Sequence, residues 1–160
     1  MAAESELMER LKSAVGGSAS RAAAAKRAAE MVREARGYRW IGVYEVGREE
    51  IAALGWTGSE PPAFTRFPVT QGISGAAVAT REPVNVGDVR KDPRYLTAFG
   101  NTRSELIVPV LDASGRVVGT LDIESERENA FGEEDLAFLR RCGEAILPLF
   151  GQSAQVQAAG

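Results

Sequence analysis

The most informative stretch of the chain reads Ser104-Glu-Leu-Ile-Val-Pro-Val-Leu-Asp-Ala-Ser-Gly-Arg-Val-Val-Gly-Thr-Leu-Asp-Ile-Glu-Ser125. Two apolar segments, Glu105–Leu111 and Arg116–Glu124, flank the residues Asp112-Ala-Ser-Gly115, which are typical of a turn. We therefore predict an antiparallel hairpin in which Asp112 faces Gly115. Counting outward from that turn gives the pairs Leu111–Arg116, Ile107–Thr120, Glu105–Asp122 and Arg103–Glu124.

Side-chain alternation divides this hairpin into two unlike faces. One face is apolar throughout and is predicted to form the main core: Leu106, Val108, Val110, Val117, Gly119, Leu121 and Ile123. The other face combines apolar and acidic residues: Ile107, Pro109, Val118, Thr120, Glu105, Asp122 and Glu124.

The three carboxylates on the second face allow two interpretations. Like charges placed opposite each other on a sheet destabilise it by up to about 1 kcal/mol, so their presence needs a reason. One interpretation is a pocket for a cationic group, such as an ammonium, against an apolar wall. The other is a solvated outer face on which Arg103 or Arg116 offsets the repulsion.

The remainder of the chain predicts helices at both ends with strands between them. Helices are expected at residues 4–15, from Ala22 to about Arg36, at 71–80 and from about Gly132 onward, and further strands at Trp40–Val46, Glu50–Thr57, Thr65–Val69 and Val84–Val86. Residues 87–103 form a long loop, which in a compact domain is typical of a binding loop. The pattern indicates an α+β fold, an antiparallel sheet covered by helices.

Composition limits the possible functions. The chain has 160 residues, a net charge of −3 and no histidine, so it lacks the usual general base and the usual transition-metal ligand. The mild acidity gives no indication of nucleic-acid or membrane-surface binding. Neither a signal peptide nor an apolar run of roughly 18–20 residues is present, so we expect a cytoplasmic protein. Cys142 is the single cysteine, which leaves no partner for an intramolecular disulfide.

Several ordered motifs resemble those of GAF domains. They are Gln71-Gly-Ile-Ser-Gly-Ala-Ala-Val-Ala, the segment Glu82–Tyr95, Ser104-Glu-Leu-Ile-Val-Pro-Val, Gly115–Ser125 and Phe131-Gly-Glu-Glu-Asp-Leu136. The resemblance spans about residues 20–150. It implies a central antiparallel sheet of about six strands, with the N- and C-terminal helices on one face and a loop-covered ligand pocket on the other. We divide the chain into a helical extension at 1–17, a GAF domain at 18–150 and a flexible tail at 151–160.

Within that family, the chain is most similar to the free methionine-(R)-sulfoxide reductases. The segments that carry this similarity are Trp40-Ile-Gly-Val-Tyr44, Ser104–Val108 and Leu121–Ser125. In those enzymes the aromatic strand and the acidic residues hold the substrate. The resemblance therefore implies a ligand-binding set of Trp40, Tyr44, Glu105, Asp122 and Glu124, the last of which is an aspartate in the enzymes.

The chain departs from these reductases at the cysteines that perform the chemistry. The matching positions are occupied by Phe64, Ser74 and Ala98, and sulfoxide reduction requires a redox-active sulfur. Cys142 lies in the closing helix, which we expect on the far side of the sheet, as a small packing residue. No residue is assigned a catalytic role, and no cofactor or metal is expected.

Three hypotheses for function follow. The first is a stand-alone, non-catalytic GAF sensor, dimeric through its terminal helices, that binds an amine or amino-acid-like ligand and signals to a separate protein. The second is a divergent free methionine-(R)-sulfoxide reductase that uses Cys142. The third is a dimerisation scaffold whose pocket has no ligand.

Overall fold

The computed structural model describes residues 2–17, 19–97 and 99–150. Position 98 and the tail predicted at 151–160 lie outside these residues. The elements in chain order are α1 (Ala2–Gly16), α2 (Arg21–Arg36), β1 (Trp40–Val46), β2 (Glu50–Thr57), β3 (Arg66–Pro68), α3 (Gly72–Thr80), β4 (Val84–Val86), the 3-10 turn η1 (Val89–Lys91), β5 (Ser104–Leu111), β6 (Val117–Ser125) and α4 (Glu133–Ile146).

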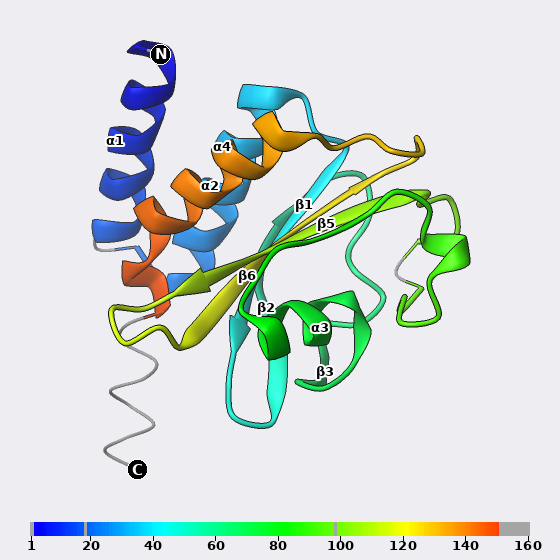
Figure 1. The fold of residues 1–160 in the computed structure, drawn as a ribbon. Coiled ribbons are helices and arrows are strands. Elements are labelled where there is room, and N and C mark those ends of the chain that lie inside the picture. The colour runs from blue at the N-terminus through cyan, green and yellow to red at the C-terminus, as the bar shows by residue number, and fades with distance from the viewer. Residues whose placement is uncertain (1, 18, 98, 151–160) are drawn as a thin grey trace.

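The strands form one six-stranded antiparallel sheet in the order β3-β2-β1-β6-β5-β4. Helices α1, α2 and α4 lie together on one side of this sheet, and α3 lies on the other side (Figure 1). The predicted α+β class and the division between terminal helices and pocket side are confirmed. No helix in the described part of the chain is both long and apolar enough to cross a membrane.

The helix side of the sheet carries the main core. Leu7, Met8 and Leu11 of α1 are buried against the neighbouring helices, so the extension predicted at 1–17 packs within the chain.

Helix α2 begins after Ser20, whose side chain accepts from the Ala23 N–H, and it ends at Gly37 in the left-handed conformation with a φ of 68°. A serine N-cap and a left-handed glycine are common helix ends, and both were readable from the sequence.

The register of the β5–β6 hairpin differs from the counted one by two residues. The Asp112 N–H donates to the Arg116 carbonyl (2.9 Å), so the turn has three residues, 113–115. Gly115 within it takes a φ of 85°, as three-residue hairpin loops commonly require. A β-bulge then inserts one more residue, because Leu111 pairs with Val117 but Val110 pairs with Gly119.

These two insertions correct the predicted pairs. Glu105 lies opposite Glu124, and Asp122 lies opposite Ile107. Since side chains alternate with a period of two, a two-residue offset leaves the carboxylates on the predicted face. Between the insertions the faces are exchanged: Val118 packs in the helix-side core and Val117 packs with the pocket-side aromatic residues.

The aromatic strand β1 supplies both faces of the sheet. Ile41 and Val43 enter the helix-side core, whereas Trp40 and Tyr44 face the pocket side. Gly42 lies between the two rings, and a Cβ atom there would come within 2.6 Å of both Trp40 Cη2 and Tyr44 Cε1. The glycine of the Trp-x-Gly-x-Tyr motif is therefore required by the close approach of the two rings.

Candidate functional site

Three carboxylates converge under the pocket side of the sheet. Glu105 comes from β5, and Asp122 and Glu124 come from alternate positions of β6. One oxygen of each carboxylate lies within 4.8 Å of the corresponding oxygens of the other two. Glu105 and Asp122 are each 7% exposed and Glu124 is 0% exposed. The face is therefore not a solvated outer surface, which was the alternative left open by the sequence.

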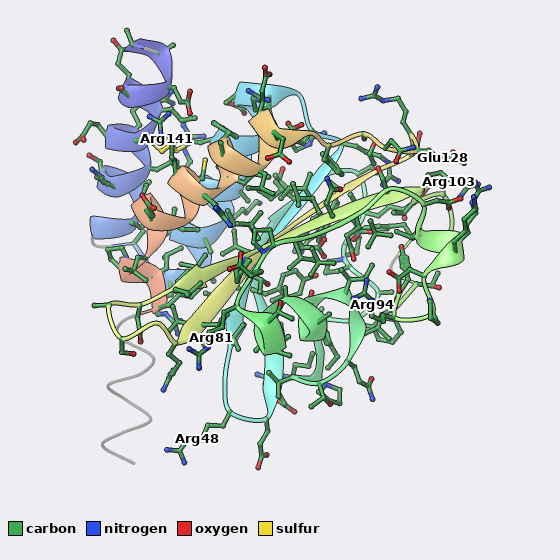
Figure 2. All side chains as sticks on the ribbon, viewed as in Figure 1. Arg48, Arg81, Arg94, Arg103, Glu128 and Arg141 are labelled. Carbon is green, nitrogen blue, oxygen red and sulfur yellow. The ribbon has the colours of Figure 1, made fainter. Side chains whose placement is uncertain are left out.

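The predicted arginine compensation is not found. Among the described residues, neither Arg103 nor Arg116 forms an ion pair with the three carboxylates. Arg103 precedes β5 at one end of the sheet (Figure 2), and its guanidinium donates to the Thr102 carbonyl. An opposing charge reaches the cluster from Arg39, which favours the ionised form of Glu124 without forming an ion pair with it.

Burial sets the protonation of this cluster. It raises the pKa of Glu105 and Asp122 well above their usual values. The charges of Asp122 and Glu124 raise the pKa of Glu105 further. The charge of Glu124 also raises the pKa of Asp122, whereas a hydrogen bond with Glu105 lowers it. Burial also raises the pKa of Glu124, while hydrogen bonds with Thr102, Glu105 and Tyr95 and the charge of Arg39 lower it. Asp122 Oδ1 and Glu124 Oε2 have no hydrogen-bond partner among the described residues. The cluster thus lacks the positive charge that would stabilise three ionised groups.

A small cavity of about 30 Å³ adjoins the carboxylates. A volume of about 10–15 Å³ holds one water, so the cavity has room for about two. Its wall brings together residues from several parts of the chain: Tyr44, Pro62, Phe64, Phe67, Gly72, Ile73, Ser74, Leu96, Glu105, Asp122 and Glu124.

The N-terminus of α3 forms the wall opposite the carboxylates. Gly72, Ile73 and Ser74 all line the cavity, and the helical hydrogen bonds begin with the Gly75 N–H, which donates to the Gln71 carbonyl. The preceding N–H groups belong to the unsatisfied end of a helix, where partial positive charge accumulates. Ser74 is 7% exposed and carries a hydroxyl that can donate a hydrogen bond. The cavity therefore has one acidic wall and one wall that favours anions.

The two aromatic residues of the predicted set occupy different places. Tyr44 lines the cavity, and burial together with the three carboxylates raises its pKa. Trp40 does not line the cavity. Its indole Nε1 donates to the Glu60 carbonyl (3.0 Å), and its ring packs edge-on against Phe99 with centroids 5.2 Å apart. Trp40 supports the pocket rather than forming its wall.

The described part of the 92–103 loop covers the site. The Tyr95 hydroxyl lies 3.1 Å from Glu124 Oε1. Arg39 holds the other end of the loop, because its Nη2 donates to Asn101 Oδ1 (2.8 Å) and its guanidinium lies 5.4 Å from the centre of the Phe99 ring. A guanidinium at that distance from an aromatic face is attracted to it. The long loop expected at 87–103 thus contacts the site, although the sequence did not single out Tyr95 or Arg39.

The positions that matched redox cysteines are found at the cavity where they fall in described residues. Phe64 and Ser74 both line it, and Ala98 lies outside the described residues. Cys142 is fully buried in the helix-side core, as predicted, and burial raises the pKa of its thiol to about 12. The sheet separates this sulfur from the carboxylates.

Comparison with known families agrees with this architecture. The model of the GAF domain family matches residues 20–146. The chain belongs to the GAF domain family. Free methionine-R-sulfoxide reductase of Saccharomyces cerevisiae is 30% identical over 110 residues, which cover 67% of this chain and 60% of that protein. GAF domain-containing protein A of Dictyostelium discoideum is 31% identical over 109 residues, 68% of this chain and 67% of that protein. The match thus spans less than two thirds of the yeast relative.

Solved structures give the same family. The free methionine-R-sulfoxide reductase of Neisseria meningitidis, determined in complex with its substrate, superimposes with a TM-score of 0.81 at 32% identity, covering 96% of this chain and 91% of that chain. A GAF sensor protein from Burkholderia vietnamiensis superimposes with a TM-score of 0.80 at 24% identity over 95% of this chain and 96% of that chain, which is a likeness of fold. The relatives of this GAF domain thus include free methionine-R-sulfoxide reductases and a GAF domain-containing protein.

Proposed function

We propose that this GAF domain is a non-catalytic binding module for a small amine or amino-acid-like ligand, whose ammonium group lies against Glu105, Asp122 and Glu124. The single observation that carries the proposal is the convergence of three buried carboxylates, two of which have oxygen atoms without partners among the described residues. Such a cluster is costly without a counter-charge, and an ammonium supplies one positive charge and three N–H donors in a small volume.

The opposite wall supports a ligand that carries a negative group as well. Gly72, Ile73 and Ser74 at the start of α3 line the same cavity as the carboxylates. The first N–H groups of a helix have no acceptor within that helix. A helix N-terminus favours a carboxylate through both its N–H groups and its partial charge. An α-amino acid presents both charges at this scale, whereas a phosphate would be repelled by the acidic wall.

The size of the cavity requires the covering loop to move. A space for about two waters does not hold an amino acid. The loop is held by polar contacts at its ends, through Tyr95 to Glu124 and through Arg39 to Asn101. We expect these contacts to open for ligand entry and to re-form, because loop motions of this kind commonly accompany enclosure of a ligand.

The non-catalytic part of the proposal rests on the sulfur chemistry. Phe64 and Ser74 offer no thiol at the cavity, and the Cys142 thiol is buried on the other side of the sheet with its pKa raised to about 12. A thiol of that kind is neither ionised at neutral pH nor accessible to a ligand near Asp122.

Calorimetric titration of the full chain tests the ligand class. We expect an amino acid such as methionine sulfoxide to bind, and the matched carboxylic acid without its amino group to bind at least about tenfold more weakly, a difference of about 1.4 kcal/mol. Glu105→Gln with Asp122→Asn should abolish this discrimination. The control Glu133→Gln changes an exposed acid on α4 and should leave it unchanged. Equal binding of the amine and of its amine-free analogue would refute the proposal.

The similarity to free methionine-R-sulfoxide reductases supports one alternative, a divergent reductase. A thioredoxin-coupled assay on free methionine-(R)-sulfoxide, with wild type and Cys142→Ser, decides between the two. No turnover by wild type supports the binding module. Turnover that is lost in Cys142→Ser supports the reductase, and turnover that survives it removes this cysteine from the mechanism.

Cytoplasmic location, a separate signalling partner and a homodimer through the terminal helices are further parts of the proposal. The apolar residues Leu7, Met8 and Leu11 of α1 are already buried within the chain. A dimer through these helices would therefore use their polar outer faces. Sedimentation of the full chain and of a chain lacking residues 1–17 tests the proposed dimer. A monomeric full chain at micromolar concentration would contradict it.

A further inference from the structure

Four oxygen-bearing side chains from three elements surround one end of the cavity. Glu105 on β5, Asp122 and Glu124 on β6 and Ser74 on α3 all line it. Each is at least nine-tenths buried. Asp122 Oδ1 and Glu124 Oε2 have no hydrogen-bond partner among the described residues. Buried polar atoms are usually paired, so two unpaired carboxylate oxygens beside one cavity point to a missing ligand.

The spacing of the carboxylates fits one metal ion. One oxygen from each lies within 4.8 Å of the others. Oxygen atoms bound to a common divalent ion lie about 2.0–2.6 Å from it, so two of them are at most about 4–5 Å apart. The three oxygen atoms therefore already lie within the span of one coordination sphere, without movement of the strands that carry them.

The donor set selects the kind of ion. Every one of these four side chains offers oxygen, and the chain contains no histidine, while its cysteine lies on the other side of the sheet. Carboxylate and hydroxyl oxygens suit Mg²⁺, Mn²⁺ and Ca²⁺ rather than ions that prefer nitrogen or sulfur. The expectation that no metal binds rested on the missing histidine, which these ions do not need. The cavity has space for the two or so waters that such an ion retains.

We infer that Glu105, Asp122 and Glu124 bind one oxygen-preferring divalent cation, with Ser74 and water completing its coordination. The metal site goes beyond the proposed amine binding and does not require it, because a metal ion and an ammonium group would compete for the same oxygen atoms. Two positive charges offset three carboxylates more fully than the single charge of an amine does. The pocket then has two classes of occupant, an inorganic and an organic cation.

Manganese chloride is the probe for the first experiment. The full chain is stripped with a chelator, dialysed and titrated with Mn²⁺, and free Mn²⁺ is followed by its electron paramagnetic resonance signal. We expect one ion per chain with a dissociation constant below about 1 mM. Mg²⁺ and Ca²⁺ should displace it. The absence of saturable Mn²⁺ binding in this range would overturn the inference.

Isosteric variants locate the ion. Glu105→Gln and Asp122→Asn should each weaken Mn²⁺ binding at least about tenfold, and Ser74→Ala should weaken it less, by a few-fold. The controls Glu133→Gln and Glu134→Gln, each altered at an exposed acid of α4, should bind Mn²⁺ as wild type does. Circular dichroism checks the fold of each variant, and the amide variants should melt no lower than wild type because they lose a buried charge. Unchanged Mn²⁺ affinity in a folded Asp122→Asn protein would place any metal elsewhere and overturn the assignment.

Competition separates the metal site from the proposed function. Amino-acid binding is measured on the chelator-treated chain and again with saturating Mn²⁺. Amine binding without Mn²⁺ binding overturns the metal site and leaves the proposed function in place. Mn²⁺ binding without amine binding overturns the proposed function and leaves the metal site in place. If both bind, Mn²⁺ should lower the apparent amine affinity, and independent binding would contradict a shared site.

Discussion

The two faces of the sheet place acidic side chains in different surroundings. On the helix side, Asp135 at the start of α4 accepts from the Gly132 N–H (3.0 Å) and the Tyr38 hydroxyl (2.8 Å), and it pairs with Arg36 (3.1 Å). Although burial acts to raise it, the pKa of Asp135 lies below its usual value because these partners favour the carboxylate. On the pocket side, Asp122 has an oxygen without a partner among the described residues and a raised pKa.

Asp135 is partly buried, with a side chain 16% exposed, whereas Asp122 is 7% exposed, so both partners and burial distinguish the structural acid from the proposed binding acid. Asp135 completes the fold by capping a helix and joining it to the segment before β1. Asp122 makes no comparable contacts with the rest of the fold. On the proposed function, a cation supplies the charge that the pocket side lacks.

The largest expected effect belongs to the helix-side core. Leu139 of α4 is fully buried there. Leu139→Ala should therefore lower the free energy of unfolding by about 2–5 kcal/mol through lost burial and a residual cavity. The matched pocket-side change is Phe64→Ala, at a side chain 45% exposed, which should cost far less. Urea denaturation measures both. Equal losses would show that the pocket side is as tightly packed as the helix side.

The next effect has the opposite sign. Asp122→Asn should raise the free energy of unfolding at pH 8 by about 1–3 kcal/mol in chelator-treated protein without ligand, because it removes a charge from the cluster. Since the folded pKa of Asp122 is raised, wild type keeps its stability below the unfolded value of about 4 and loses it as the pH rises toward the folded pKa. The advantage of Asp122→Asn should therefore disappear near pH 4. An advantage that grows as the pH falls would contradict the raised pKa.

A somewhat smaller loss is expected for the helix-side acid. Asp135→Asn should destabilise the protein at pH 7 by about 1–2 kcal/mol, because the cap and the charged hydrogen bonds are weakened. The weakened interactions are those with the Gly132 N–H and with Arg36. The folded pKa of Asp135 is lowered, so its contribution is present above the unfolded value of about 4 and is lost as the pH falls. Thermal melts from pH 3 to 7 test this, and a stabilising Asp135→Asn would remove the contrast with Asp122.

The smallest effect concerns Cys142. Its thiol is fully buried and burial raises its pKa to about 12. Iodoacetamide at pH 8 should therefore leave the native chain unlabelled, because the thiolate is the reactive form. Urea-unfolded protein serves as the control and should be labelled completely. Mass spectrometry measures the extent of labelling in both samples. Rapid labelling of the native chain would reopen a redox role for this residue.

The sequence alone predicted the fold class and the face of the sheet that carries the three carboxylates. It did not predict which residues surround them. Alternation correctly placed Glu105, Asp122 and Glu124 on one face, because a two-residue shift in pairing does not change the face on which a side chain lies. The pairs themselves depended on the length of the turn, since Gly115 is compatible with more than one turn type, and on the bulge at Val118, which has no distinct residue signature. The resemblance assigned Trp40 to the ligand-binding set. Which side chains line the cavity depends on packing, and Trp40 is not among them.

The partners from loops were the least predictable part of the site. Tyr95 and Arg39 lie far from the carboxylates in sequence and follow no repeat that would align them with β6. The motif Gly72-Ile-Ser-Gly75 was recognised, but that it faces the acids across the cavity depends on how α3 packs over the sheet (Figure 1). Such relations arise from tertiary packing.

The central claim, that the pocket side needs a cation, is tested most directly by comparing wild type with the double variant Glu105→Gln, Asp122→Asn in chelator-treated buffer at pH 8. The double variant should melt higher than wild type without any cation. Added Mn²⁺ or an amino acid should raise the melting temperature of wild type and leave that of the variant unchanged. A double variant that melts lower than cation-free wild type would show that the carboxylates already stabilise the fold unaided, which would contradict the claim.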